Sequence, residues 1–331
     1  MDILVLGGTK FVGRHIVRTA IDRKHQVTLF NRGQTNPDLF PEVEKLVGDR
    51  DGDLAPLRER PWDAVIDTCG YVPRIVRNSA QVLSKQTDIY VFISTISVFA
   101  SFEKVGLSED DPLGSLDDET VEEITGDTYG PLKALCEAVI QDEITGRALI
   151  IRPGLIVGPH DPTDRFTYWV RRCAQGGDIL APAPPDQNVQ FIDARDLASW
   201  TLDRIEAGHT GTFNATGPEN PLTLGKFLQT CCGLSEDDAR LVWVDGTTLL
   251  DAGIDPWSQL PMWLPGPKNA GLMAVDCTRA IRAGLRFHPL VTTIRDTLKW
   301  DRDRDPSVPM KAGLEPSREA ELLALHRKQA Q

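Results

Sequence analysis

The sequence predicts a doubly wound α/β fold, and the first 33 residues carry the strongest signal for it. Residues 2–6 and 26–30 are short apolar runs rich in branched side chains, which is typical of strands buried on both faces. A glycine turn at residues 7–13 follows the first run, and apolar side chains then recur at helical spacing up to Ile21. A strand, a glycine turn, a helix and a second strand form the unit that places a dinucleotide pyrophosphate at a helix N-terminus.

Strands and helices continue to alternate in the next part of the chain. Residues 63–67, 89–94 and 148–151 have the pattern of buried strands, and helices are expected over residues 74–85 and 129–143. Hairpin signals are absent between them, which indicates a parallel sheet with helices on both faces. We therefore predict a Rossmann-type doubly wound parallel sheet with a smaller C-terminal substrate lobe.

The pattern becomes less regular after residue 151. The expected elements there are a turn-rich stretch at 152–159, helices at 166–175, from 193 onward, at 276–284 and at 290–300, strands at 189–192, 212–214 and 241–244, and an irregular segment at 253–272. We assign residues 1–160 to an NAD(P)-binding core and residues 161–300 to a mixed region that returns to the core and forms the substrate lobe. Residues 301–331 form a charged tail, ending in a helix that packs on the body or on a partner chain.

The bulk composition excludes several classes of protein. The formal net charge of −12 over 331 residues argues against nucleic acid as a partner, because phosphate backbones bind to clustered basic surfaces. No apolar stretch approaches the ~20 residues of a membrane span. Met1 leads directly into the first strand, so we expect a cytoplasmic protein without membrane contact. The six cysteines lack metal-ligand spacing, and no metal site is predicted.

The glycine turn has a composition that suits a phosphate. Gly7 permits a tight bend, Gly8 lets the backbone approach a phosphate, and Gly13 lets the helix pack closely against the strand. Ordinary strand-to-helix turns also contain glycine, but the position between two buried strands favours a cofactor site. The residues of the turn that we assign to cofactor binding are Gly7, Gly8, Thr9, Lys10, Phe11, Val12 and Gly13.

Tyr129 and Lys133 are one helical turn apart and therefore share a helix face. An ammonium beside a phenol favours the phenolate and lowers the pKa of the phenol from its usual value of ~10. Such a phenol can exchange a proton with a substrate oxygen at neutral pH. The same spacing occurs by chance on helix surfaces, but here Thr95 follows a predicted strand and offers a hydroxyl to the same oxygen. We predict that Thr95, Tyr129 and Lys133 are catalytic.

With these motifs the chain resembles an extended short-chain dehydrogenase/reductase of the NAD-dependent epimerase/dehydratase type, over roughly residues 1–300. The resemblance implies that Tyr129 is the acid/base, that Thr95 takes the place of the family's Ser/Thr and that Lys133 binds the nicotinamide ribose. For the family's fourth catalytic residue, an asparagine, Asn78 is the only candidate. The further cofactor contacts that follow from the resemblance are Asp49, Arg50, Thr68, Cys69, Gly70, Pro153 and Gly154.

Two departures from the family pattern bear on function. NAD-binding members carry an acidic residue at the end of the second strand, where it binds the ribose 2′-hydroxyl, whereas this chain has Asn31 and Arg32. A guanidinium suits a 2′-phosphate, and Lys10 adds charge nearby, so NADP is slightly favoured over NAD. The alternative is that Arg32 stacks on the adenine of NAD. The second departure is that Thr95 lacks the following Asp-Glu pair of sugar-nucleotide 4,6-dehydratases, so no such activity is expected.

The resemblance implies hydride transfer at a secondary alcohol or carbonyl carbon of a small-molecule substrate, a sugar or sugar nucleotide, by an NAD(P)-dependent epimerase or oxidoreductase. A diphosphate group could be met by Arg165, Arg171 and Arg172, although solvated helix charges explain these arginines equally well. An NADPH-dependent reductase of another small carbonyl compound is the alternative enzyme. Relatives also suggest a homodimer, formed through the helix that carries Tyr129 and the helix before it.

A non-catalytic RNA-binding Rossmann protein is the alternative from another class. The glycine turn resembles that of the chloroplast stem-loop-binding proteins, which share the Gly7-Gly8-Thr9 opening and a basic residue at Lys10. The Thr28-Leu29-Phe30 strand, followed by Arg32 and Gly33, belongs to the same similarity. The negative net charge and the complete set of Thr95, Tyr129 and Lys133 argue against this alternative.

Overall fold

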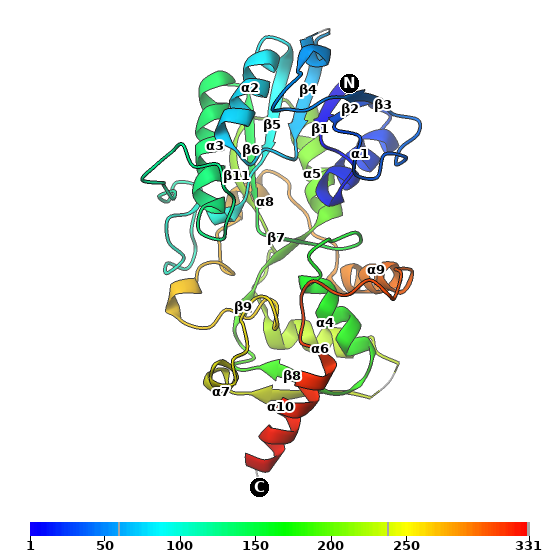
Figure 1. Ribbon diagram of the computed structural model, residues 1–331, viewed down its shortest axis with the longest axis vertical. Helices are drawn as coiled ribbons and strands as arrows, with labels where there is room; N and C mark the ends of the chain where they lie inside the picture. The colour runs from blue at the N-terminus through cyan, green and yellow to red at the C-terminus, as the bar shows by residue number, and fades with distance from the viewer. Residues whose placement is uncertain (59, 237, 330–331) are drawn as a thin grey trace.

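The computed structural model describes residues 1–58, 60–236 and 238–329. Seven parallel strands form one sheet, which confirms the predicted doubly wound α/β fold (Figure 1). In spatial order the strands are β11 (Gly211–Ala215), β6 (Ala148–Pro153), β5 (Thr87–Ile93), β4 (Trp62–Asp67), β1 (Asp2–Leu6), β2 (Gln26–Asn31) and β3 (Glu44–Val47). The strand order reverses at β1, and open α/β sheets bind ligands at such a point, beyond the carboxyl ends of the strands.

Both faces of the sheet are covered by helices because β1 presents apolar side chains on both. Ile3 and Val5 belong to a hydrophobic cluster on the face of α1 and α5, whereas Leu4 and Leu6 belong to a cluster on the face of α2 and α3. Successive side chains of a strand point to opposite faces, so a continuous apolar run suits this position. The four helices are α1 (Phe11–Asp22), α5 (Ala194–Glu206), α2 (Pro73–Leu83) and α3 (Tyr129–Glu143).

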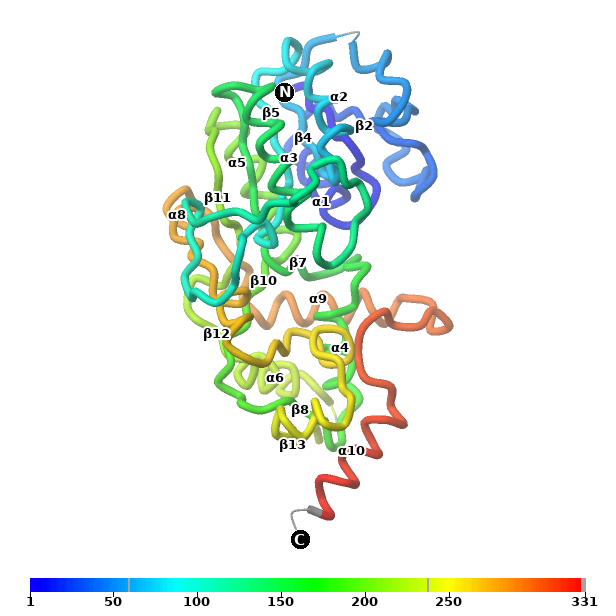
Figure 2. The backbone as a smooth tube through the Cα atoms, turned by 60° about the vertical axis from the view of Figure 1, so that its left-hand side comes forward, coloured from blue at the N-terminus to red at the C-terminus, as the bar shows by residue number. Residues whose placement is uncertain are grey.

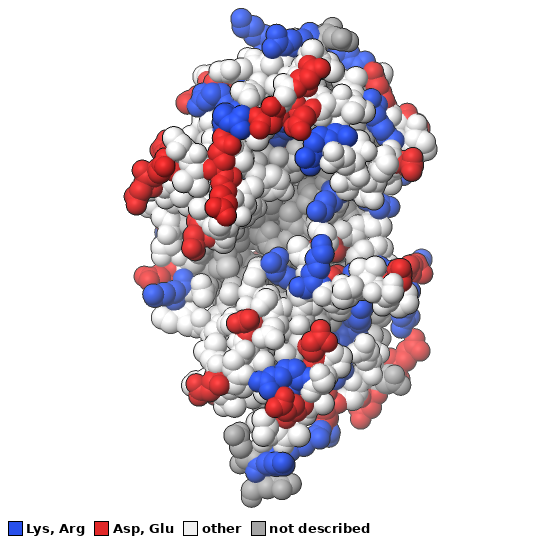
Figure 3. Space-filling view, in the orientation of Figure 1, with Lys and Arg blue, Asp and Glu red and all other residues white. Residues whose placement is uncertain are grey.

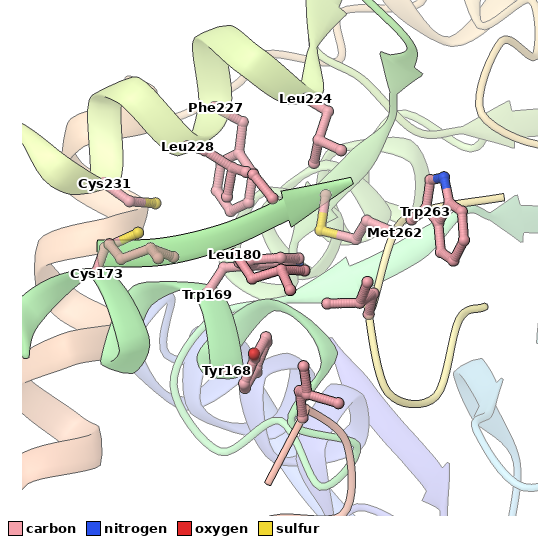
Figure 4. Packing of buried hydrophobic residues seen from close by; sticks show 14 of the residues in the cluster. Tyr168, Trp169, Cys173, Leu180, Leu224, Phe227, Leu228, Cys231, Met262 and Trp263 are labelled. Carbon is pink, nitrogen blue, oxygen red and sulfur yellow. The ribbon is translucent and has the colours of Figure 1, made fainter. Parts of the chain in front are cut away.

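A second hydrophobic core lies at the opposite end of the molecule (Figures 1 and 2). Trp169, Leu180, Phe227 and Leu228 pack together there, from two helices and a strand (Figure 4). The parallel strands β8 and β13 run through this part. Its elements are α4 (Arg165–Ala174), β8 (Gly177–Pro182), α6 (Leu224–Cys232), β13 (Ala239–Val244), α7 (Gly246–Asp251) and α9 (Leu290–Arg302).

Two short strand pairs lie between the large sheet and the second core. In one, β7 (Leu155–Val157) runs parallel to β10 (Phe191–Asp193), and in the other, β9 (Asn188–Val189) runs antiparallel to β12 (Leu222–Thr223). The remaining short helices are η1 (Ala55–Arg58), η2 (Ile96–Val98), η3 (Pro267–Asn269) and α8 (Thr278–Arg282).

Most differences from the sequence-based expectation fall in this second half. The stretch 152–159 was expected to be turns, but its residues 155–157 form β7, because three apolar residues between two prolines suffice for a short parallel pairing. The expected strand at 189–192 is divided between β9 and β10, and the helix expected at 276–284 is limited to α8. Neither β8 nor α7 was expected, because their residues lack clear periodicity.

The C-terminal segment packs on the body of the same chain. It ends in α10 (Pro316–Gln329), where Glu319 forms an ion pair with Arg172 at 2.7 Å and accepts a hydrogen bond from the Leu180 amide. Leu322 and Leu323 are buried in the second core. The tail therefore contacts its own chain, and residues 330–331 of the expected tail lie outside the described residues.

Within the described part of the chain, no helix has the length and apolarity needed to cross a membrane. Among the same residues, no group of three or more metal-ligating side chains is placed to hold a metal ion.

A buried ion pair joins α3 to β6 behind the carboxyl edge of the sheet. Arg152 donates to both carboxylate oxygens of Glu137 at 2.7–3.2 Å, and Ser94 Oγ donates to the same carboxylate at 2.5 Å. All three side chains are buried. Because Ser94 directly precedes Thr95, this network fixes the end of β5.

Removing one partner of this pair should destabilise the fold strongly. For Glu137→Ala we expect a loss of about 3–5 kcal/mol in the free energy of unfolding, because Arg152 then remains buried without a countercharge. The matched control is Glu143→Ala on the same helix, which breaks a half-exposed pair with Arg77 and should cost about 0–1 kcal/mol. Urea denaturation of both variants measures the difference. Equal losses in the free energy of unfolding would contradict the larger contribution that we assign to the buried pair.

Candidate active site

A cavity of about 850 Å³ lies at the carboxyl edge of the sheet, between the sheet and the second core. Figure 3 shows this face hollowed there, with Lys and Arg side chains beside the hollow. Most of its wall comes from loops that follow β1, β2, β3, β4 and β5. Trp257, Leu272 and Met273 close it from the irregular segment before α8. The predicted turn residues Gly7, Gly8, Thr9, Lys10, Phe11, Val12 and Gly13 all line this cavity.

The glycine turn lets α1 pack closely against β1. Gly7 and Gly8 have φ values of +100° and +89°, which side-chain-bearing residues rarely adopt. A Cβ at Gly13 would lie 2.9 Å from the backbone of Gly8, so only glycine fits without displacement. No side chain caps the N-terminus of α1, and its first amide groups are therefore available to an anion. The residues present fit a dinucleotide pyrophosphate.

The end of β2 contributes one structural and one free polar side chain. Asn31 donates to the carbonyl of Gly7 at 2.9 Å and accepts from the amide of Gly33 at 2.9 Å, so it ties the end of β2 to the glycine turn. Arg32 is exposed, lines the cavity and takes part in none of the ion pairs seen among the described residues. Asp49 lines the same end of the cavity and binds the amide of Asp51.

Arg50 reaches the cavity wall, but its guanidinium points beneath it. It donates to both carboxylate oxygens of Asp67 at 2.7 and 2.8 Å and to Ser79 Oγ at 2.6 Å, and all three side chains are buried. The Tyr90 hydroxyl donates to the same carboxylate at 3.1 Å. Arg50 therefore holds the loop after β3 against the end of β4. This structural role replaces the cofactor contact that was expected for Arg50.

The other predicted cofactor residues divide between the wall and the layer behind it. Thr68, Cys69 and Gly154 line the cavity, and Thr68 Oγ1 donates to the carbonyl of Leu6 at 2.8 Å. Gly70 and Pro153 do not belong to the wall. Gly70 lies one layer deeper, where a Cβ would meet the Phe92 ring at 2.6 Å.

Thr95 and Tyr129, both predicted to be catalytic, lie together at the cavity wall. Thr95 is buried, and its hydroxyl donates to Ser97 Oγ at 3.1 Å and accepts from the Ser97 amide at 3.1 Å. Tyr129 is half-buried at the first residue of α3. Burial raises the pKa of Tyr129, and a hydrogen bond with Thr95 opposes that rise. The phenol is thus protonated at neutral pH.

Lys133 does not reach the cavity, which corrects the expectation that it lowers the pKa of Tyr129. Its ammonium donates to the carbonyls of Gly70 and Ile93 at 2.7 and 2.8 Å, and the side chain is buried. Burial lowers the pKa of Lys133 to about 8. One helical turn of spacing places two side chains on one face, but the carbonyls of Gly70, in the loop after β4, and Ile93, at the end of β5, decide where the ammonium points.

The three arginines proposed for a diphosphate are separated by the structure. Arg165 lines the cavity, with its guanidinium 5.1 Å from the centre of the Trp257 ring. Arg171 and Arg172 instead bind Asp301 and Glu319 of the C-terminal part and are therefore structural. Asn78 is exposed on α2, outside the cavity. Sequence reasoning missed Trp257 and Met273, whose segment has no periodicity, and Tyr71, which follows the β4 motif directly.

A sequence profile described as the NAD dependent epimerase/dehydratase family matches residues 3–215. The chain belongs to this family. Among curated relatives of this family member, the chloroplast stem-loop binding protein of 41 kDa b from Arabidopsis thaliana is 25% identical over 254 residues, which are 69% of this chain and 62% of that protein. The probable low-salt glycan biosynthesis reductase Agl14 from Haloferax volcanii is 29% identical over 117 residues, 34% of this chain and 38% of that protein. The matches thus span less than two thirds of either relative.

Solved structures of known epimerases share the fold of this epimerase/dehydratase family member. UDP-N-acetylglucosamine 4-epimerase from Bacillus cereus matches with a TM-score of 0.65 and 17% identity, over 94% of this chain and 99% of that one. UDP-glucuronic acid 4-epimerase from Bacillus cereus, solved in complex with NAD, matches with a TM-score of 0.64 and 14% identity, over 91% and 99% of the two chains. These similarities establish the fold, and the family assignment rests on the sequence profile.

A methyl group in the glycine turn should weaken cofactor binding. We expect Gly13→Ala to weaken NADH and NADPH binding on the order of ten-fold or more, because α1 must move away from Gly8 and each ~1.4 kcal/mol lost is a factor of ten. Gly126→Ala is the control, since a Cβ there meets nothing within 4 Å. Fluorescence titration with both nucleotides measures the effect, and wild-type affinity in Gly13→Ala would contradict the cofactor assignment.

Proposed function

We propose that this chain is an NAD(P)-dependent epimerase or oxidoreductase that transfers hydride at a secondary alcohol or carbonyl carbon of a sugar or sugar nucleotide. The observation that carries the proposal is that the uncapped N-terminus of α1, Thr95 and Tyr129 face one cavity. Membership of the epimerase/dehydratase family supports the same reaction class. A bound nicotinamide would supply the hydride acceptor or donor.

The chain's own groups would handle the pyrophosphate and the proton. The free amides at the start of α1 would bind the pyrophosphate, and Asp49 and Arg32 flank the adenosine end of the cavity. Thr95 would hold the substrate oxygen by a hydrogen bond. The protonated Tyr129 hydroxyl would give its proton to that oxygen during reduction, and the phenolate would take it back during oxidation. Lys133, whose ammonium binds the carbonyls of Gly70 and Ile93, would support the wall behind Tyr129.

Three features of the substrate half support a sugar nucleotide. Arg165 offers a guanidinium to an anionic group, and Trp257, against which it lies, offers a flat apolar face. Leu272 and Met273 add apolar wall beside it. The solved epimerases named above act on UDP-sugars, as their names state. A screen of UDP-sugars with each cofactor, followed by proton NMR of the products, tests this assignment, and the absence of turnover across the panel would overturn it.

An NADPH-dependent reductase of another small carbonyl compound is the second candidate. Arg32 favours it, because an exposed guanidinium beside the cavity suits a 2′-phosphate and the Asn31 amide is already engaged with Gly7. The similarity to Agl14, a reductase by name, points the same way. RNA binding, suggested by the name of the plant relative, is opposed by the net charge of −12.

Removal of the Tyr129 hydroxyl should lower the rate without loss of cofactor. For Tyr129→Phe we expect kcat to fall at least ~10²-fold, the usual contribution of general acid–base catalysis, while nucleotide affinity stays close to that of the wild type. Tyr168→Phe makes the same change in the second core and should keep wild-type turnover. Turnover on the best substrate of the screen is the measurement. A Tyr129→Phe variant with nearly full activity would remove Tyr129 from the mechanism.

Cofactor preference should depend on Arg32. We expect Arg32→Ala to lower NADPH affinity on the order of ten-fold and to leave NADH affinity within about two-fold, because a charge-assisted contact to a phosphate is worth about 1.5–3 kcal/mol. Lys85→Ala removes the same charge from an exposed position outside the cavity and serves as the control. Equal losses for both nucleotides would instead place Arg32 on the shared adenine.

A further inference from the structure

Tyr71 is an aromatic residue of the cavity wall to which neither the family motifs nor the proposed mechanism gives a role. It follows Gly70 in the loop after β4, lines the cavity and keeps 44% of its surface exposed. A large aromatic side chain on a loop usually buries most of its surface or has a specific contact. The contacts of Tyr71 are with two of the three predicted catalytic residues.

The Tyr71 ring lies beside Tyr129 and over Lys133. The two phenol rings have centroids 6.4 Å apart at an interplanar angle of 37°. The Lys133 ammonium is 5.4 Å from the centre of the Tyr71 ring and 4.0 Å from that of Phe92. Both distances are within the range of a cation–π interaction. Together with the carbonyls of Gly70 and Ile93, two aromatic faces therefore surround the ammonium.

This arrangement explains why Lys133 is absent from the cavity wall. The side chain of Lys133 is only 2% exposed, although the first residue of its helix, Tyr129, faces the cavity. Phe92 is fully buried beneath the sheet edge and cannot separate the ammonium from the cavity. Tyr71 is the ring that contacts Lys133 and also faces the cavity, so it forms the outer cover.

We propose that Tyr71 is a positioning residue: its ring covers the Lys133 ammonium and supports the Tyr129 ring, so that the two proposed catalytic side chains keep a fixed separation. The proposal rests on the function proposed above, since it concerns the same pair. It assigns the effect to the aromatic face of Tyr71 and not to its hydroxyl. Without the Tyr71 ring, the Lys133 ammonium would be open to water and to reagents from the cavity.

The charged and titratable groups around the three side chains are consistent with this role. Lys133 faces Cys136 and Glu137 on its own helix, and Asp67 and Arg50 from the layer beneath. Tyr71 faces Tyr129, Cys69 and Asp67, and partial burial in the wall raises the pKa of Tyr71 to about 12. A neutral phenol over an ammonium interacts through its ring, as the proposal requires.

Amine labelling of the full-length protein tests the cover directly. Under an acylating reagent, Lys133 in the wild type should react slowly, with the exposed Lys10 as the internal reference. We expect Tyr71→Ala to raise the labelling rate of Lys133 on the order of ten-fold, because burial suppresses amine reactivity and the cover is removed. Tyr71→Phe should match the wild type. Trp257→Ala opens the same cavity away from Lys133, so the labelling rate of Lys133 in this variant should also equal that of the wild type.

A second readout follows the Tyr129 phenol, which a merely structural role of Tyr71 would leave unchanged. The chain has four tyrosines, so carbon NMR of ring-labelled tyrosine resolves each one, with Phe variants for assignment. In Tyr71→Ala the titration midpoint of Tyr129 should fall, because the phenol becomes more hydrated and burial is what raises its pKa. In Tyr71→Phe it should stay at the wild-type position.

Unchanged Lys133 labelling in a folded Tyr71→Ala variant would overturn the proposal, and so would a Tyr71→Phe variant that behaves like Tyr71→Ala. If Tyr71→Ala does not fold by circular dichroism, Tyr71→Leu replaces it, with the same expected rise in labelling. Neither readout uses turnover. Failure of the proposed activity would therefore leave this test intact, and failure of this test would leave the activity assignment intact.

Discussion

The close contact between Gly13 and the backbone of Gly8 is the constraint on which the rest of the site depends. It sets the distance between α1 and β1, and the two left-handed glycines before it direct the chain from strand to helix. Asn31 then fastens the adjacent strand to the same turn through the Gly7 carbonyl. The first two strands and the first helix thus form one rigid unit, and the free amides of α1 point from it into the cavity.

Two buried ion pairs extend this rigidity along the carboxyl edge of the sheet. Arg50 and Asp67 join the loop after β3 to the end of β4, and Glu137 and Arg152 join α3 to β6 beside Ser94. Each pair is fully hydrogen-bonded on its carboxylate side, which offsets the cost of burying charge. Their positions suggest that polar contacts beneath the wall define the shape of the site, whereas apolar clusters on the two faces of the sheet stabilise the fold.

Residues whose roles depend on local pattern could be predicted from the sequence, and residues whose roles depend on long-range partners could not. Most strands of the large sheet, the glycine turn and the placement of Thr95 and Tyr129 follow from periodicity and spacing. The inward direction of Lys133 depends on the carbonyls of Gly70 and Ile93 from two other parts of the chain, and the structural use of Arg50 depends on Asp67. β7 was missed because its pairing partner lies more than thirty residues later. Trp257 belongs to a segment that no repeating pattern describes.

The cavity wall draws on two hydrophobic cores that pack independently. Residues that face the proposed nucleotide are held by the sheet clusters, whereas Arg165 and Trp257 belong to a part built around the separate core of α4, α6 and β8. Substitutions at Trp257 or Met273 therefore change the shape of one half of the cavity without altering the support of the other. Such a division lets the choice of substrate change during evolution while the residues on the sheet side of the cavity stay the same. Homologues should therefore differ first in the irregular segment.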